Sequence, residues 1–357
     1  MIDRRTFGLA AGAALLGGQA MARVKAKIPV VIAHRGASGE RPEHTALAYS
    51  LAIAQGADFI EPDLVITRDG ALVARHENEI GGTTDVAARP EFAARQATRV
   101  IDGETVTGWF TEDFTLAELK TLRCRERLPK LRPASAAFDG QAQILTFQEV
   151  VDLARTEGAR VGRRIGVYPE MKHPAWFASL GLPFEGRMAA ALKTAGLEGR
   201  DAPCFVQCFE VGPLKTLRGL VGTPLVQLVS QDGGPADLPG VTYASMIDAA
   251  GLKAIAAYAD GVGPQTTLVI PTDGKGLLPA TSFVADAHAA GLKVHPWTVR
   301  RENFFLPTTL RGPGDDQAPG DVQALLAALF KAGVDGVFSD FPAEAVRARN
   351  RFIGGNA

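Results

Sequence analysis

The sequence is poor in cysteine, with Cys124, Cys204 and Cys208 in 357 residues. An odd number leaves at least one thiol unpaired in a monomer. Cys204 and Cys208 fall in one expected strand, about 13 Å apart at the usual rise per residue, which is too far for a bridge. We therefore expect no disulfide framework and no thiol chemistry, with the three side chains buried as small apolar groups.

The chain also lacks an excess of one charge and a long apolar run. It has 38 Lys and Arg against 39 Asp and Glu, and the net charge of −1 gives no sign of a nucleic-acid or anionic-membrane partner. Residues 7–22 are apolar but too few and too rich in glycine to span a bilayer comfortably. No cysteine lies near their end, since the first is Cys124, which argues against a lipid-anchored lipoprotein. We expect no stable membrane anchor.

Residues 1–22 instead resemble an export signal. They contain Asp-Arg-Arg-Thr-Phe-Gly-Leu, an order similar to a twin-arginine signal, and end in Ala20-Met21-Ala22, an A-x-A cleavage pattern. The alternative is a simple N-terminal anchor. We expect a periplasmic or secreted protein that has lost this segment.

The rest of the chain alternates short apolar runs with amphipathic stretches, the pattern of a parallel α/β fold. Expected strands are Val30–Ala33, Ala57–Ile60, Ala71–Ala74, Ile165–Tyr168, Pro203–Phe209, Pro224–Ser230, Thr267–Ile270, Lys293–Val299 and Val334–Asp340. Expected helices are Thr45–Ala54, Thr146–Gly158, Gly186–Ala195, Val211–Leu220, Ser282–Ala290 and Val322–Ala332. Nine strands are one too many for a (β/α)8 barrel, so we discard Thr267–Ile270, with which Gly261–Pro264 competes. We expect the barrel in residues 29–349.

Residues 77–145 break this rhythm after the third expected strand. They are polar, and only Thr115–Leu122 looks like a capped helix. A segment of this length with little regular pattern inside a compact domain is normally a functional insertion, and the alternative is a disordered surface loop.

Polar side chains gather where the expected strands end. They are His34 and Arg35 after Val30–Ala33, Glu61 and Asp63 after Ala57–Ile60, and His76 after Ala71–Ala74. Each alone is a weak sign, because a histidine at a strand end is more often structural. Carboxyl ends of parallel strands meet at one face of a barrel, so two carboxylates, two imidazoles and a guanidinium converge there. Such a set indicates a metal site that handles phosphate.

These residues resemble the signature of the glycerophosphodiester phosphodiesterase family, which is H-R, then E-x-D, then H. The stretch GASGERPEHT at 36–45 is similar to the family block Gly-Ala-x-Gly-x-x-Pro-Glu-Asn-Thr, with His44 in the usual place of Asn. Motifs at 207–210, 295–300 and 333–342 match as well, and the pattern at 295–300 with a long insertion is closest to periplasmic members. The resemblance implies a barrel of the phospholipase-C-like phosphodiesterase type, whose insertion covers the mouth.

The resemblance also implies roles for individual residues. Metal ligands would be Glu61, Asp63 and Glu170, and the acid and base would be His34 and His76 without a fixed order. Phosphate would be held by Arg35 and Lys172, with Glu43 in support, while Phe209 and Trp297 would pack on the glycerol carbons or belong to the core. Of the other histidines, we expect His44 to start a helix, His295 and His173 to be weaker candidates, and His288 to lie on the surface.

The chemistry fits this assignment. Three carboxylates would repel one another and a phosphodiester unless a hard divalent cation neutralised them. Flexible oxygen ligands in an exported protein favour Ca²⁺, with Mg²⁺ as the alternative. The implied reaction is hydrolysis of glycerophosphodiesters, small-molecule substrates, to glycerol 3-phosphate and an alcohol, directly by water or through a cyclic phosphate. A lysophospholipase D-like enzyme and a non-catalytic exported binding protein are the alternatives. A sugar isomerase or glycoside hydrolase would have no use for Arg35 and Lys172.

Overall fold

The computed structural model describes residues 28–355, so the expected export signal at 1–22 lies outside the described residues. The strands are β1 (Val30–His34), β2 (Phe59–Glu61), β3 (Asp63–Ile66), β4 (Leu72–Ala74), β5 (Ala97–Ile101), β6 (Glu104–Gly108), β7 (Gly166–Val167), β8 (Glu170–Met171), β9 (Val206–Cys208), β10 (Leu225–Val229), β11 (Gly261–Pro264), β12 (Lys293–Val294) and β13 (Gly336–Ser339).

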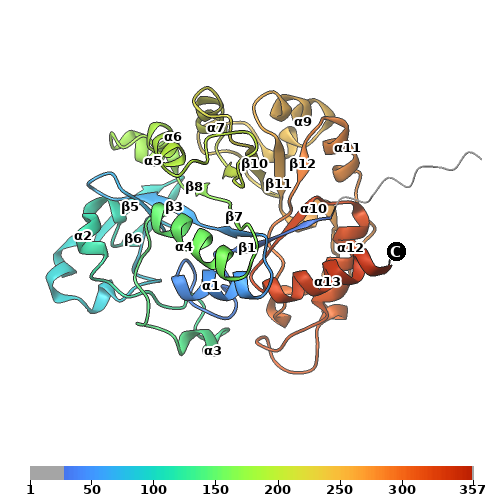
Figure 1. Ribbon diagram of the computed structural model, residues 1–357, viewed down its shortest axis with the longest axis horizontal. Helices are drawn as coiled ribbons and strands as arrows, with labels where there is room; N and C mark the ends of the chain where they lie inside the picture. The colour runs from blue at the N-terminus through green and yellow to red at the C-terminus, as the bar shows by residue number, and fades with distance from the viewer. Residues whose placement is uncertain (1–27, 356–357) are drawn as a thin grey trace, which may run out of the picture.

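Most of these strands form a closed parallel barrel (Figure 1). Strands β2 and β3 follow one another in a single stave, as do β7 and β8, and the order around the barrel is β13, β1, β2–β3, β7–β8, β9, β10, β11 and β12. A parallel bridge from Val299 to Ser339 closes the ring between β12 and β13. The prediction of an eight-stranded (β/α) barrel is therefore confirmed.

Each stave is followed by a helix on the outside of the barrel. In order, these helices are α1 (Ala46–Ala54), α4 (Phe147–Arg160), α6 (Phe184–Thr194), α7 (Val211–Arg218), α9 (Ala249–Ala256), α11 (Phe283–Ala289), α12 (Val322–Ala332) and α13 (Pro342–Gly355). Shorter elements are α2 (Leu116–Leu119), α3 (Pro133–Ala136), α5 (Pro174–Ser179), α8 (Tyr243–Met246), α10 (Thr266–Val269), η1 (Val86–Ala88), η2 (Pro90–Arg95), η3 (Thr111–Asp113), η4 (Asn303–Phe305) and η5 (Thr308–Leu310).

Helix capping and the burial of apolar side chains stabilise the barrel and its helices. Helix α4 begins with a capping box, in which the Thr146 hydroxyl accepts from the Glu149 N–H and the Glu149 carboxylate accepts from the Thr146 N–H. The main apolar core lies between barrel and helices. A smaller core fills the barrel with Ile32, Tyr168, Phe205, Val226 and Phe338.

One of the eight retained barrel strands was wrong and one barrel strand was missed, whereas the decision to discard Thr267–Ile270 was right. The run Ala71–Ala74 is not a stave, because β4 pairs antiparallel with β3 and folds back over it. The missing stave is β11, Gly261–Pro264, and the discarded Thr267–Ile270 is largely helix α10. Glycine suits β11 because a Cβ on Gly263 would lie 2.6 Å from the Leu228 side chain. Close packing therefore requires glycine in β11, and glycine weakens the apolar pattern by which a strand is predicted from sequence.

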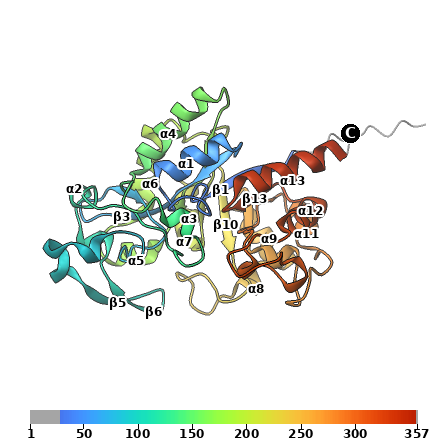
Figure 2. The same cartoon turned by 90° about the horizontal axis from the view of Figure 1, so that it is seen from below.

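The segment 77–145 lies between the second stave and α4, and it is folded. It contains the β5–β6 hairpin, η1 to η3, α2 and α3, and Figures 1 and 2 show it on the side of the barrel opposite α12 and α13. The predicted cap is present, since the Thr115 side chain and Glu118 form a capping box at α2. Hereafter this segment is the insertion.

The three cysteines are free and buried. Among residues 28–355 no helix has the length and apolar character needed to cross a membrane.

Candidate active site

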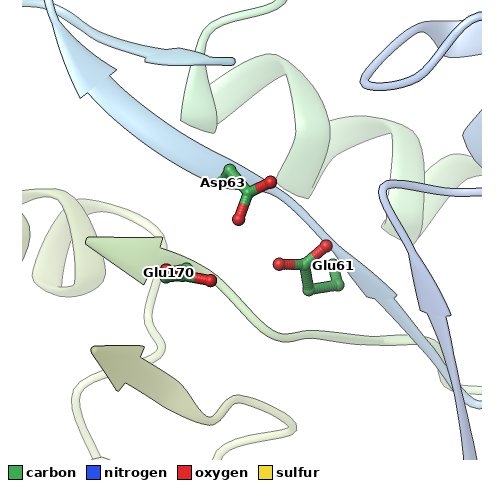
Figure 3. Close-up of side chains that lie close together, drawn as sticks. All are labelled: Glu61, Asp63 and Glu170. Atoms are coloured by element: carbon green, nitrogen blue, oxygen red, sulfur yellow. The ribbon is translucent and has the colours of Figure 1, made fainter. Parts of the chain in front are cut away.

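Three carboxylates converge at one end of the barrel (Figure 3). Glu61 ends β2, Asp63 begins β3 and Glu170 begins β8, where it pairs with Asp63 across parallel strands. Each offers an oxygen within 4.8 Å of the others, and all three residues are buried. The i, i+2 spacing across Pro62 places the first two on one face, as the sequence predicts.

The electrostatics of this cluster suit a hard cation. Burial, with Asp63 and Glu170 close by, raises the pKa of Glu61 well above its usual range. Burial likewise raises the pKa of Glu170 to about 7, against the opposing charge of Lys172. Within the described residues, the buried Oδ1 of Asp63 has no hydrogen-bond partner. Ca²⁺ and Mg²⁺ prefer oxygen ligands, and this cluster offers three carboxylates, one of which has an oxygen without a hydrogen-bond partner. These residues therefore fit a divalent ion.

Neighbouring groups hold the carboxylates in place. His44 joins Asp63 Oδ2 at 2.9 Å through Nε2 and the Tyr49 hydroxyl at 2.8 Å through Nδ1, and it is fully buried. Gln207 donates to Glu61 Oε1 at 3.1 Å. The expectation that His44 merely starts a helix was wrong, because Thr45 caps α1 while the imidazole orients a carboxylate.

His34 lies at the end of β1 and is oriented by a carboxylate from the far end of the chain. Its Nδ1 donates to Asp340 Oδ1 at 2.6 Å. Burial and the nearby Arg35 lower the pKa of His34 to about 4, despite Asp340. The imidazole is therefore neutral at pH 7, and the carboxylate fixes the tautomer that leaves Nε2 as a proton acceptor.

His76 reaches the same place by a different route from the predicted one. Because β4 runs antiparallel to β3, the chain returns toward the carboxylates, and the Arg75 N–H donates to the Asp63 carbonyl at 2.9 Å. His76 comes next, with Nδ1 against Glu77 and Nε2 3.2 Å from Lys172 Nζ. Burial, Arg35 and Lys172 lower the pKa of His76 to about 3.

The predicted phosphate-binding residues are also at the cluster. Arg35 Nη1 donates to Glu43 at 3.0 Å and its Nε lies 3.1 Å from Asp63 Oδ2. Lys172 Nζ donates to Glu170 at 2.9 Å. Glu43 in turn accepts two bonds from Arg127 of the insertion, at 2.6 and 2.9 Å. Two cationic groups thus lie beside three carboxylates, and the insertion supports one of them.

A cavity of about 250 Å³ opens over these groups. His34, Arg35, His76 and Lys172 line it with Glu61 and Glu170. Phe209 and Trp297, both predicted, form an apolar wall with their rings edge to face and their centroids 5.5 Å apart. We refer to it as the catalytic cavity.

Several contributors were not identified from the sequence. Asp340 lies in the matched motif at 333–342 and Arg300 in the motif at 295–300, so these motifs carried a usable signal. Arg127 and Arg132 lie in the insertion, where no pattern distinguishes them from surface arginines. Their placement depends on the folded insertion.

The remaining histidines lie away from the reacting groups. His295 is buried and bonds the Tyr168 hydroxyl at 2.9 Å, inside the barrel and not among the residues that line the catalytic cavity. His173 precedes α5 and pairs with Asp102 at 2.6 Å. His288 lies on α11 and is largely exposed, as expected.

Comparison with known proteins identifies related sequences. The profile described as "Glycerophosphoryl diester phosphodiesterase family" matches residues 34–344. Glycerophosphodiester phosphodiesterase GDPD6 of Arabidopsis thaliana is 37% identical over 325 residues, which cover 88% of this chain and 84% of that protein. Glycerophosphodiester phosphodiesterase of Haemophilus influenzae is 29% identical over 341 residues, covering 88% and 87%.

Solved structures agree on the fold. A putative glycerophosphoryl diester phosphodiesterase from Silicibacter pomeroyi superimposes with a TM-score of 0.64 at 22% identity, covering 91% of this chain and 94% of that one. A phosphodiesterase from Oleispira antarctica, solved with the product sn-glycerol-3-phosphate, superimposes with a TM-score of 0.60 at 23% identity, covering 90% and 97%.

Proposed function

Because the chain belongs to the glycerophosphoryl diester phosphodiesterase family and is an enzyme of that kind, we propose that it hydrolyses glycerophosphodiesters to glycerol 3-phosphate and an alcohol. The observation that supports this most is that two imidazoles, Arg35 and Lys172 line one cavity together with Glu61 and Glu170, which form a carboxylate cluster with Asp63. Phosphodiester hydrolysis uses all three kinds of group. The phosphate needs a counter-charge, the nucleophile needs a base and the leaving alkoxide needs an acid.

Glu61, Asp63 and Glu170 would hold a divalent cation, with Ca²⁺ favoured and Mg²⁺ the alternative. Such an ion, when bound, polarises phosphoryl oxygens as a Lewis acid. Arg35 and Lys172 add positive charge beside it and would bind the remaining phosphate oxygens, Arg35 through its planar guanidinium and Lys172 as a point charge.

The two histidines would divide the acid and base roles between them. A carboxylate lies against Nδ1 of each ring, Asp340 for His34 and Glu77 for His76, so Nε2 is the atom of each that would exchange a proton with the substrate. One imidazole would accept the proton of the nucleophile, water or the glycerol 2-hydroxyl, and the other, protonated at Nε2 when the anionic substrate binds, would pass that proton to the leaving alkoxide. Phe209 and Trp297 would pack against the carbon atoms of the glycerol unit.

The test is release of glycerol 3-phosphate from a mixture of glycerophosphodiesters by purified protein, measured enzymatically in chelator and then with Ca²⁺ or Mg²⁺ restored. Release that chelator stops and one ion restores is expected. No release with any diester and either ion would refute the proposed activity. Release that persists in chelator would remove the cation from the mechanism.

One observation favours a second activity of the lysophospholipase D type. An open groove of about 610 Å³ shares Arg127, Leu128 and Phe304 with the space beside His34 and Arg35. Leu128, Leu131 and the exposed Phe304 give it a largely apolar surface among charged residues. A single acyl chain on the glycerol could lie there. Choline release from lysophosphatidylcholine tests this, and a Phe304→Asp variant should release choline more slowly than the wild type. A variant rate equal to or above that of the wild type would count against this activity.

We also propose that the protein is exported to the periplasm, as a periplasmic type of the family, because of the arginine pair and A-x-A pattern in residues 1–22. Mass spectrometry of the protein from the periplasmic fraction should show an N-terminus at residue 23. Full-length protein in the cytosolic fraction would contradict this.

A further inference from the structure

A second cavity of about 200 Å³ adjoins the catalytic cavity and shares His34, Arg35 and Arg300 with it. Its other walls come from the insertion, through Arg127, Leu128 and Arg132, and from the chain after β12, through Phe304 and Phe305. The remaining lining residues are Ser38, Glu43 and Asp340. We call this space the alcohol cavity. Through the shared residues it adjoins the groups proposed to act on phosphate.

The insertion and the chain after β12, which form the outer wall of this cavity, are joined by hydrogen bonds. Gln317 donates to the Lys130 carbonyl at 2.8 Å, and Arg132 donates to Glu302 at 2.7 Å. Arg132 also donates to Asp340 at 2.6 Å and to the Ser38 carbonyl at 3.1 Å, and it is buried. The wall is therefore a built part of the site. In Figure 1 both segments lie along the lower edge of the molecule, that of the insertion around α3 and that after β12 to its right.

Arginine donors dominate the polar lining of this cavity. Four arginines line it against two carboxylates, while Glu77 and Glu302, which pair with two of the arginines, lie outside the lining. Both oxygens of each lining carboxylate are already occupied. Glu43 accepts from Arg35 and Arg127, and Asp340 accepts from His34, Arg132 and Arg300. Every oxygen of the lining carboxylates therefore already accepts at least one hydrogen bond from an arginine or from His34.

Arg300 stands where the two cavities meet. Its Nε donates to Asp340 at 2.9 Å, and its guanidinium lies over the Phe305 ring, 4.7 Å from the centroid. These contacts fix the plane of the guanidinium, while its terminal amino groups carry no hydrogen bond to any residue between 28 and 355. The Arg300 guanidinium also covers one face of the Phe305 ring, where a quaternary ammonium could otherwise bind.

We propose that the alcohol cavity binds the leaving alcohol and that Arg300 selects alcohols bearing hydroxyl or carboxylate acceptors over quaternary ammonium alcohols. This rests on the proposed function and names its substrate class. A polyol such as glycerol gives the free guanidinium donors oxygen partners. Choline offers no acceptor on its cationic end and would bring a positive charge beside four arginines without an unoccupied carboxylate, which is unfavourable.

The test compares kcat/KM for glycerophosphoglycerol and glycerophosphocholine, by release of glycerol 3-phosphate. The wild type should prefer the glycerol diester by at least about tenfold, since a site built to hydrogen-bond a hydroxyl rejects a substrate that lacks it. Arg300→Met should lower kcat/KM for the glycerol diester by about 10- to 100-fold more than it lowers kcat/KM for the choline diester, so the preference collapses.

Arg301→Met is the matched control. Arg301 is the neighbouring arginine, lies over the Phe341 ring and does not line either cavity, so its removal should leave the ratio of the two kcat/KM values unchanged. A wild-type preference for the choline diester would overturn the inference. An equal loss on both substrates in Arg300→Met would overturn it too, because Arg300 would then contact the shared phosphate.

If the proposed function is wrong, neither diester is hydrolysed, and this outcome is distinct from a wrong preference between the two. If neither diester is hydrolysed, calorimetric binding of the two diesters to the wild-type protein in the presence of Ca²⁺ still decides the question. Tighter binding of the glycerol diester, lost in Arg300→Met, supports the alcohol cavity. Equal or tighter binding of the choline diester overturns it.

Discussion

The Glu210→Gln substitution should stabilise the protein in alkaline but not in acidic solution. Glu210 follows β9, is buried, and accepts the Ala175 N–H at 2.9 Å from α5. Burial, with Asp102 and Asp237 nearby, raises the pKa of Glu210 to about 8 from a usual value of 4.5, although the Ala175 N–H opposes the rise. A neutral side chain of the same shape can keep the hydrogen bond without the ionisation.

The sign and size follow from proton linkage. Below pH 4.5 the carboxyl is protonated in both the folded and the unfolded chain, so its full stability contribution is present. Between pH 4.5 and 8 the unfolded chain ionises while the folded chain holds its proton, and stability is lost as pH rises. A rise from 4.5 to about 8 corresponds to about 5 kcal/mol at about 1.36 kcal/mol per pKa unit.

Urea unfolding, followed by circular dichroism, measures this difference. At pH 5 the variant and the wild type should differ by no more than about 1 kcal/mol, and at pH 8.5 the variant should be more stable by roughly 4 kcal/mol. Glu198→Gln, which removes the same charge from an exposed position, is the control and should show no such pH trend. A Glu210→Gln difference that stays constant from pH 5 to 8.5 would refute the reasoning.

Three further predictions concern the site and its frame. Asp340→Asn should lower kcat about 10²- to 10⁴-fold with little change in KM, because His34 loses the carboxylate that orients it for proton transfer; steady-state kinetics measure this, and an unchanged kcat would exclude the role. Asp63→Asn should weaken Ca²⁺ binding at least about tenfold in calorimetry, and unaltered affinity would remove Asp63 from the ligands. Arg132→Met should destabilise the protein by about 3–5 kcal/mol in urea, since it leaves Glu302 buried without its partner. Adding Glu302→Gln should recover part of that loss, and a purely additive double variant would contradict the coupling.

Much of the site could be predicted because its residues are adjacent to strong apolar runs. Glu61 and Asp63 share a face by the two-residue period of a strand, and Glu170 follows another buried run. His34 ends the first strand in the same way. These positions depend on local spacing and on the rule that parallel strands present their carboxyl ends together.

The rest depended on contacts that no local pattern encodes. His76 was expected from a parallel stave, whereas an antiparallel hairpin returns it to the carboxylates. His44 resembled a helix start, and only the fold places its ring on Asp63, 19 residues away. Arg132 reaches Asp340 across 208 residues. Pairings of that kind are set by tertiary structure, so the sequence predicted a functional insertion but not which of its arginines reach the site.

The central claim is that one cation lies among Glu61, Asp63 and Glu170 with the phosphate between His34 and His76. Anomalous diffraction at the manganese edge, from crystals grown with Mn²⁺ and glycerol 3-phosphate, tests it directly. The account predicts a single anomalous peak bounded by the three carboxylates, with the phosphate against that ion and within reach of both imidazoles. A cation bound elsewhere, or a phosphate held away from the two histidines, would contradict it.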